Sequence, residues 1–375
     1  MKNEASFQIF LHSPCTDSAD REQIIRTLES GWIAPGGPWA KAFEEKISRM
    51  TDAPYALALS NGTAALHLAL KLLGMEAGDT VIVPSHTYIA SASPVHYEKG
   101  RIVVVDSERE SLNMSPRYLE HALEKLKQEG IRPRAVIITH IYGLPARLDE
   151  LSAVAGAYGV PIIEDAAESV GSWYRGRHTG TWGNMGILSF NGNKTITAGG
   201  GGALLVKEKH LWQRGKKWAG HAKEDFPYFY HKEWGYNYQI PALTASLGIS
   251  QLSKLARIVS RKREIHDTYT RYLSALPLQA VNETGDAQSN YWLNAFLTEK
   301  SGQASALTDF LQSHGIEARR FWFPLHRMPL LKDAMYVGSD ETVDFFERGV
   351  LLPSSPCLSE EEMEKVTDTI RKFYA

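Results

Sequence analysis

Two polar segments that follow apolar runs have residues suited to holding a planar, phosphorylated ligand. The first, Ser60-Asn61-Gly62-Thr63, joins small residues to the start of a helical pattern. Such a turn can bind an anion through backbone N–H groups, or it can simply cap the helix. The second, Pro84-Ser85-His86-Thr87-Tyr88, ends in an aromatic side chain that can stack on a flat ring or pack into a core.

Two further segments place a carboxylate and an amine at similar positions. Asp165 follows the apolar run 160–163. It can keep a pyridine nitrogen protonated, cap a helix or form a structural ion pair. Lys194 follows the run 186–190 and is flanked by small polar residues. Near a cofactor its pKa can fall enough for attack on a carbonyl carbon, although most lysines are solvated surface residues.

Taken together, the four segments predict an anion cradle, a stacking aromatic, a carboxylate for a ring nitrogen and a reactive lysine, the set that a pyridoxal-type cofactor needs. The glycines at 199–202 follow Lys194 and suit a backbone packed close to another group. They lead into a strand instead of opening a helix, so they do not match a dinucleotide fingerprint. We therefore exclude a nicotinamide cofactor.

These segments lie at the ends of predicted strands, where open α/β sheets bind ligands. The expected strands are residues 55–60, 81–84, 102–106, 135–140, 160–164, 186–190 and 203–206. Helices are expected at 63–73, 115–129 and 148–158, the second with Leu119, Leu123 and Leu126 on its buried side. The alternation predicts a largely parallel seven-stranded sheet covered on both faces. The last two strands lack a helix between them, which indicates a mixed sheet.

The C-terminal third has a different pattern and predicts a smaller α+β domain. A long helix is expected at 240–273, with Arg257, Arg261, Lys262 and Arg263 exposed. Strands at 291–298 and 316–321 and helices at 304–313 and 360–374 follow. We place the domain boundary near residue 255, which gives domains 1–255 and 256–375.

The composition is that of a soluble globular protein of 375 residues with 43% hydrophobic residues. The net charge of −2 and the absence of a basic stripe argue against a nucleic-acid partner. The two cysteines, Cys15 and Cys357, have no metal-ligand spacing, so we expect no metal site, and folding does not require a disulfide. No signal peptide or membrane span is recognisable. These features predict a cytoplasmic protein.

The sequence resembles the DegT/DnrJ/StrS family of nucleotide-sugar aminotransferases along nearly its whole length. The resemblance rests on Gly-Trp-Ile-Ala-Pro-Gly at 31–36, Ser-Asn-Gly-Thr-Ala-Ala at 60–65, Pro-Ser-His-Thr-Tyr at 84–88, Glu-Asp-Ala-Ala-Glu-Ser at 164–169, the stretch 189–202, Gly-Tyr-Asn-Tyr at 235–238 and Phe-Pro-Leu-His at 323–326. The most specific of these is 189–202. The resemblance implies the pyridoxal-phosphate fold type I of aspartate aminotransferase, with pyridoxal 5′-phosphate as the cofactor.

The resemblance also implies a role for each matching residue. Lys194 forms the Schiff base and then moves the proton between cofactor and substrate carbons. Asp165 pairs with the pyridine nitrogen, Glu168 lies near the ring hydroxyl and Tyr88 stacks on the ring. The phosphate is held by Thr63, the N–H of Ala64 and Ser189, and the cofactor site further includes Gly62 and Asn191.

Other implied roles concern the substrate and a second subunit. Asn237 is expected to reach the phosphate in the neighbouring subunit, which makes a homodimer with shared active sites the active unit. Trp32 and His326 lie in segments that resemble sugar-nucleotide contacts, and residues 1–35 are expected to contribute to the substrate site.

Within the family, Ser-Phe-Asn-Gly-Asn-Lys at 189–194 most resembles enzymes that aminate UDP-4-keto-6-deoxy-N-acetylhexosamines, in routes to bacillosamine-type sugars or exopolysaccharide, with glutamate as donor. Gln239 replaces a frequent Arg, and Ala-Gly-Gly at 198–200 replaces Gly-Glu-Gly, so the substrate is less certain than the reaction. The alternatives are an aminotransferase for TDP-linked, GDP-linked or 3-keto sugars, a sugar dehydratase of the same fold, and a binding protein without activity. Lys194 argues against the dehydratase, because those relatives have histidine there.

Overall fold

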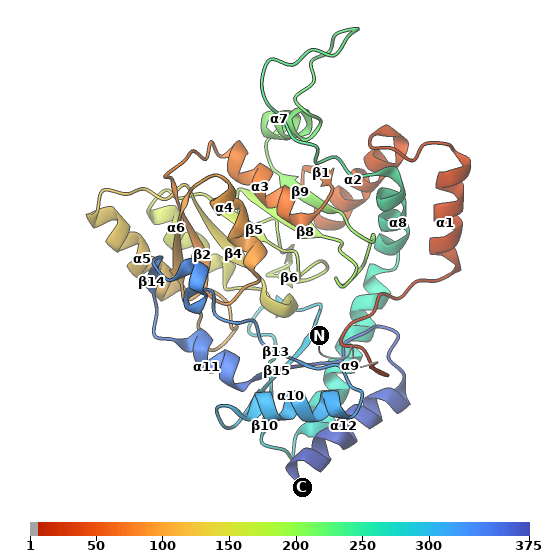
Figure 1. Ribbon diagram of the computed structural model, residues 1–375, viewed down its shortest axis with the longest axis vertical. Coiled ribbons are helices and arrows are strands. Elements are labelled where there is room, and N and C mark those ends of the chain that lie inside the picture. Colours follow the sequence, from red (N-terminus) through yellow and green to blue (C-terminus); the bar gives the residue numbers. More distant parts are fainter. Residues whose placement is uncertain (1–6) are drawn as a thin grey trace.

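The computed structural model describes residues 7–375 and shows two packed parts (Figure 1). An eight-stranded sheet with its helices forms the upper part, and a four-stranded sheet with its helices forms the lower part. Residues 1–6, which belong to the segment expected to contribute to the substrate site, lie outside the described residues. No helix within residues 7–375 has the length and apolar character needed to cross a bilayer.

The large sheet has the strand order β1-β9-β8-β5-β4-β2-β3-β14. Its neighbours pair in parallel except at β9, which is antiparallel to β1 and β8, so the mixed sheet is confirmed. All seven predicted strands are present: β1 (Tyr55–Leu59), β2 (Thr80–Pro84), β3 (Arg101–Val105), β4 (Ala135–Thr139), β5 (Ile162–Asp165), β8 (Met185–Ser189) and β9 (Gly202–Val206). An eighth, β14 (Met335–Val337), extends the edge beside β3 and was not predicted.

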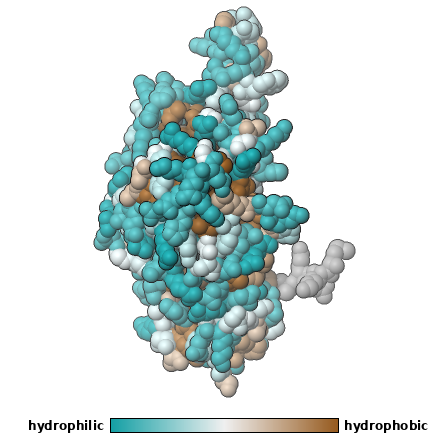
Figure 2. Space-filling view, turned by 90° about the vertical axis from the view of Figure 1, so that its left-hand side faces the viewer, coloured by the Kyte–Doolittle hydropathy of each residue, from teal (hydrophilic) through white to brown (hydrophobic). Residues whose placement is uncertain are grey.

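Helices cover both faces of this sheet because alternate strand residues point to opposite sides. Val81 and Val83 of β2 join the core under α3 (Gly62–Leu72), whereas Ile82 joins the core under α5 (Pro116–Gln128) and α6 (Leu148–Ala157). The face at the left of Figure 1, where α5 lies, is mostly hydrophilic with scattered apolar spots (Figure 2). This agrees with the predicted α5, which buries Leu119, Leu123 and Leu126 and exposes its charges.

The lower part contains a sheet of order β10-β12-β15-β13 and three long helices. These elements are β10 (Leu278–Ala280), β12 (Asn294–Thr298), β13 (Arg319–Arg320), β15 (Gly349–Leu352), α9 (Leu255–Leu273), α10 (Gln303–Ser313) and α12 (Glu360–Tyr374). Two elements from this third of the chain lie against the upper part: β14, and β11 (Ala287–Gln288), which pairs with β6 (Trp173–Tyr174). The division at residue 255 stays a prediction.

The remaining elements lie around the two sheets or between them. They are α1 (Ser18–Glu29), α2 (Gly37–Thr51), η1 (Ile89–Ser91), α4 (Ser93–Tyr97), η2 (Ile141–Gly143), β7 (Arg177–His178), α7 (Lys209–Ala219), α8 (Ala242–Leu252), η3 (Leu325–Arg327), η4 (Pro329–Leu331) and α11 (Glu341–Arg348).

The helix predicted at 240–273 is two helices, α8 and α9, and the prediction that Lys262 is exposed was wrong. The break falls at Ser253 and Lys254. The amine of Lys254 is held by Asp17 and Asp20 at 2.6 Å each. Lys262 is fully buried because it lies on the inward stripe of α9, between Ile258 and Ile265.

The two cysteines form a disulfide, which the sequence analysis did not predict. Cys15 precedes α1 and Cys357 precedes α12, so the bond joins the N-terminal segment to the end of the lower part. Two backbone hydrogen bonds continue this attachment: Ser354 N–H donates to Leu11 O at 2.7 Å, and Glu317 N–H donates to Ile9 O at 2.8 Å.

A projecting loop, residues 221–235, extends above α7 at the top of Figure 1. We call it the aromatic arm. A bridge between Lys223 and His231 closes it, and a bridge between Gly220 and Asn237 lies at its base. Its exposed large apolar side chains are Phe226, Tyr228, Phe229, Tyr230 and Trp234, the last 97% exposed. Aromatic side chains so exposed on a protruding loop are typical of a surface that another chain covers.

Candidate functional site

A cavity of about 380 Å³ opens at the carboxyl ends of β5 and β8. Asp165 ends β5 and Ser189 ends β8, so the sheet itself places their side chains at the cavity. Eight of the predicted site residues line it: Gly62, Thr63, Tyr88, Asp165, Glu168, Ser189, Asn191 and Lys194. The sheet therefore gathers residues that are more than 130 positions apart in the sequence, from Gly62 to Lys194.

The Lys194 amine lies between a carboxylate and an aromatic face. Its Nζ is 3.8 Å from Glu168 Oε1 and 4.0 Å from the centre of the Trp292 ring. Burial lowers the pKa of Lys194, and the charges of Glu168 and Asp165 oppose that shift. A lysine whose pKa is lowered has more of the neutral amine that reacts with carbonyl carbon.

Asp165 is held by two donors at the end of β5. Ser91 Oγ donates to Asp165 Oδ2 at 2.8 Å, and the Ala167 N–H donates to Oδ1 at 3.2 Å. The Thr87 and Ser91 hydroxyls are 2.8 Å apart, which fixes the Ser91 side chain in turn. The carboxylate is thereby fixed at the cavity wall, and a carboxylate in that place suits a cationic ring nitrogen.

Glu168 faces Lys194 from the segment after β5. Its Oε2 accepts a hydrogen bond of 2.7 Å from the Tyr142 N–H. Burial raises the pKa of Glu168, and the positive charge of Lys194 opposes the rise. Tyr142 has a φ of 55°, an uncommon left-handed conformation. This conformation is the one in which its N–H reaches Glu168.

The N-terminus of α3 lies at the place where the anion cradle was predicted. The first turn of a helix leaves N–H groups without partners inside the helix, and Gly62 and Thr63 occupy that turn beside Ser189. A Cβ at Gly62 would lie 3.2 Å from the Ser189 Cβ, closer than an ordinary contact, so glycine suits this close approach. The N–H of Ala64 donates to Asn61 Oδ1 at 2.7 Å. In this structure the helix cap occupies it, and its expected contact with the phosphate stays a prediction.

Aromatic side chains form the mouth of the cavity. Tyr88 is 57% exposed, and its ring centre is 5.9 Å from that of Trp322. Trp292, whose indole N–H donates to Asn193 O at 2.6 Å, forms the wall beside Lys194. The sequence analysis missed both tryptophans, as well as Ser91 and Arg319, which also line the cavity. Only Ser91 had a nearby signal, because it lies three residues after Tyr88.

Three predicted site residues lie away from this cavity. His326 contacts Ser85 Oγ at 2.7 Å and Asp340 Oδ1 at 3.0 Å. Trp32 is 50% exposed and lies against Gly37. Asn237 is exposed at the base of the aromatic arm. Their roles toward a substrate or a second subunit stay predictions.

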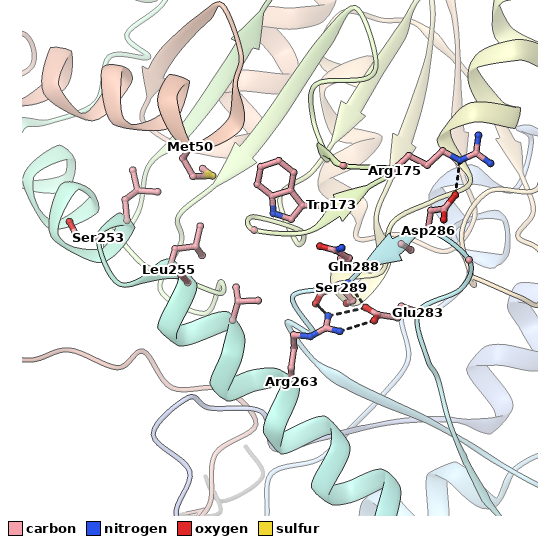
Figure 3. Close-up of a pocket in the computed structure, with 17 residues that line it drawn as sticks. Met50, Trp173, Arg175, Ser253, Leu255, Arg263, Glu283, Asp286, Gln288 and Ser289 are labelled. Carbon is pink, nitrogen blue, oxygen red and sulfur yellow. Dashed lines mark hydrogen bonds and ion pairs between the residues drawn. The ribbon is translucent and has the colours of Figure 1, made fainter.

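A larger hollow of about 1340 Å³ lies between α9 and the β6–β7 hairpin (Figure 3). Its charged side chains are paired with each other: Arg263 Nη2 is 2.7 Å from Glu283 Oε1, and Arg175 Nε is 3.1 Å from Asp286 Oδ2. It contains no lysine and none of the predicted site residues. The Lys194 cavity therefore remains the candidate site.

Comparisons with known proteins identify the family of this chain. Residues 14–371 match the DegT/DnrJ/EryC1/StrS aminotransferase family. The chain belongs to this family. It is 38% identical to EpsN of Bacillus subtilis, which is named as a pyridoxal phosphate-dependent aminotransferase, with 98% of this chain and 96% of that protein covered. It is 34% identical to the GDP-perosamine synthase of Escherichia coli O157:H7, with coverages of 97% and 98%. The crystal structure of a DegT DnrJ EryC1 StrS aminotransferase from Brucella abortus has a TM-score of 0.89 at 27% identity and covers 95% of both chains.

Membership confirms the fold class, the aminotransferase class and the cofactor expected from the sequence, pyridoxal phosphate. The cavity fits this group on its own evidence. It has a buried lysine with a lowered pKa, a fixed carboxylate at Asp165, and first-turn N–H groups beside Ser189 for a phosphate. Thr63 and Ser189 would hold its phosphate and Asp165 would face its ring nitrogen, and these roles stay predictions.

Proposed function

We propose that the chain transfers an amino group from an amino acid, glutamate by preference, to a nucleotide-linked 4-keto-6-deoxy sugar. The observation that carries this is the placement of Lys194 between Glu168 and Trp292, in the same cavity as Asp165. Family membership supports an aminotransferase that acts on sugars.

The residues that line the cavity have different roles in such a reaction. When bound, pyridoxal phosphate supplies an aldehyde that condenses with amines and a ring that takes up carbanion charge. Asp165, which two donors hold in place, would keep a proton on the ring nitrogen. The neutral amine of Lys194 takes the proton from the donor Cα and returns a proton to the acceptor carbon in the reverse half-reaction. Trp292 and Trp322 line the cavity and limit water near these proton transfers.

The acceptor we propose is UDP-4-keto-6-deoxy-N-acetylglucosamine, which would place the enzyme in bacillosamine-type or exopolysaccharide synthesis. Support comes from the resemblance of segment 189–194 and from the similarity to EpsN. The 34% identity to a GDP-perosamine synthase favours a GDP-linked 4-keto sugar as the second candidate. A dehydratase of the same fold is disfavoured by the lysine at position 194.

The active unit we propose is a homodimer in the cytoplasm. The exposed aromatic arm supports a second copy as the covering partner, because it projects from the same part of the chain as Asn237. Asn237 does not line the cavity of its own chain, which suits a role in the neighbouring one.

Two experiments test this function. Reduction of the holoenzyme with borohydride, followed by digestion and mass spectrometry, is expected to place the cofactor tag on the Lys194 peptide. A tag on another amine would refute the site. Coupled assays with the UDP-linked and GDP-linked keto sugars, each with glutamate, then identify the acceptor. Amination of the GDP sugar alone would overturn the UDP proposal and leave the site intact.

A further inference from the structure

The ionisable groups that line the Lys194 cavity leave one permanent positive charge for a substrate. Apart from the phenol of Tyr88, they are Asp165, Glu168, His140, Lys194 and Arg319. The His140 ring accepts the Ala146 N–H at 3.1 Å through Nδ1 and contacts Glu164 at 3.1 Å through Nε2, so both nitrogens are engaged. Lys194 has a lowered pKa and is committed to the chemistry. Arg319 remains, because a guanidinium stays protonated in proteins.

Arg319 is oriented by a fixed carboxylate on one edge. Glu317 Oε1 accepts from Arg319 Nη2 at 2.7 Å and from Nε at 3.2 Å. The other oxygen of Glu317 accepts the Leu11 N–H at 3.0 Å, so this carboxylate is itself held in place. The Arg319 side chain is 55% exposed, and Nη1 makes no hydrogen bond with residues 7–375. A guanidinium has five donors in a planar fork, so its second edge can bind another carboxylate.

The neighbouring arginine shows the opposite arrangement. Arg320 donates to Phe346 O at 2.7 Å, lies 3.7 Å from the Phe346 ring centre and does not line the cavity. Because strand residues alternate in direction, β13 directs one arginine to the cavity and the other to α11. Arg320 is therefore a matched control for Arg319.

The positive charge of Arg319 can bind the negative charge of an amino-acid donor. Glutamate carries two carboxylates, and the cavity already has Asp165 and Glu168 in its wall. The cofactor phosphate adds further negative charge. A donor anion would therefore be repelled unless a cation at the cavity binds it.

We propose that Arg319 binds a carboxylate of the amino donor and so selects amino acids for the first half-reaction. This rests on the function proposed above and names the residue that recognises the donor. Glu317 acts as the positioning residue, because it fixes one edge of the guanidinium and leaves the other toward the cavity.

The direct test is binding of glutarate, a dicarboxylate that has no amine and does not react. Calorimetry with the holoenzyme is expected to show binding about 10- to 100-fold weaker in Arg319→Gln and unchanged in Arg320→Gln. Thermal melting checks that each variant is folded. Arg319→Lys keeps the positive charge but loses the planar set of donors, so it should bind glutarate with intermediate affinity. It replaces the Gln variant in this test if the Gln variant does not fold. Equal binding of glutarate by wild type and Arg319→Gln would overturn the proposal.

The two half-reactions separate this role from a structural one. In single turnovers, Arg319→Gln should slow the step with glutamate and leave the step with the keto sugar unchanged. A loss confined to glutamate, with L-alanine unaffected, assigns the side-chain carboxylate, and an equal loss with both donors assigns the α-carboxylate. A loss in the keto-sugar step alone would overturn the proposal in favour of a phosphate contact. Failure of the proposed function would instead appear as an untagged Lys194 in the wild type.

Discussion

The amine of Lys194 lies 3.8 Å from the carboxylate of Glu168, inside a cavity that largely buries both side chains. Burial disfavours the charged form of each group, so it lowers the pKa of the lysine and raises the pKa of the glutamate. Their attraction opposes both shifts. The balance decides how much neutral amine is available at the pH of the cell.

Glu168→Gln should therefore lower the pKa of Lys194 further. The carboxylate favours the ammonium form, and its removal leaves burial and the weaker influence of Asp165. Labelling of the apoenzyme with trinitrobenzenesulfonate across pH, with the Lys194 peptide followed by mass spectrometry, measures the midpoint. Glu150→Gln, which removes an exposed carboxylate paired with Arg147, should leave the midpoint in place. A midpoint that moves upward in Glu168→Gln would contradict the arrangement.

Lys262→Met should change the pH dependence of stability. Lys262 is buried and donates to Trp292 O at 3.0 Å and Ser354 O at 2.7 Å, and burial holds its pKa well below the usual value. When the amine is neutral, its loss leaves two carbonyl groups without donors, so we expect the variant to be about 1–3 kcal/mol less stable near pH 10.

The sign of the pH effect follows from proton linkage. Below about pH 10.4 Lys262 is protonated in the unfolded chain, whereas burial keeps it neutral in the folded chain until a lower pH. The unfolded state therefore binds more protons, and the stability of the wild type falls as the pH falls. The advantage of lysine over methionine should shrink from pH 10 toward pH 7. Urea unfolding at several pH values measures it, with Lys41→Met as the exposed control. A pH-independent difference would mean that Lys262 titrates like a surface lysine.

The Cys15→Ser, Cys357→Ser double variant should be less stable than the oxidised wild type. The disulfide closes a loop with a sequence separation of 342 residues. Restricting so long a loop in the unfolded chain stabilises a protein by typically about 2–4 kcal/mol. Urea unfolding with and without reductant measures the loss. Reductant should leave the double variant unchanged, and a wild type equally insensitive would show that the bond is not formed.

The elements that the sequence predicts well are those whose signals are local. Each strand of the large sheet before β14 is an apolar run that ends in polar or small residues, so both the strands and the residues at their ends were predicted. Lys262 was predicted to be exposed because it is charged, but it lies on the buried face of α9 between Ile258 and Ile265. The stripe was visible in the sequence.

Other parts depend on contacts across the chain and have no local signal. Trp292 reaches the cavity from a segment 98 residues after Lys194, and Arg319 from β13 in the lower sheet. The β14 strand is three residues long, too short to be recognised without its partner β3. The Cys15–Cys357 pair likewise follows from the path of the N-terminal segment beside the lower sheet.

Mixing two inactive variants should restore activity if the active sites are shared between subunits. Lys194→Ala removes the reactive amine, and Asn237→Ala removes a side chain that lies outside the cavity of its own chain. In a mixed dimer, one site would combine the intact Lys194 of one subunit with the intact Asn237 of the other. Random pairing makes half of the dimers mixed, each with one intact site of two, so co-refolding should recover roughly a quarter of the wild-type rate.

Two controls make this result specific. Lys194→Ala mixed with Asp165→Ala should stay inactive, because both residues line the same cavity and no pairing restores a complete site. Removal of aromatic side chains from the arm, as in Phe229→Ser with Trp234→Ser, should weaken association, since both are exposed in the single chain and a second copy would cover them. Sedimentation velocity measures that loss. Full activity of Asn237→Ala alone, or a monomeric wild type at the assay concentration, would show that each chain holds a complete site.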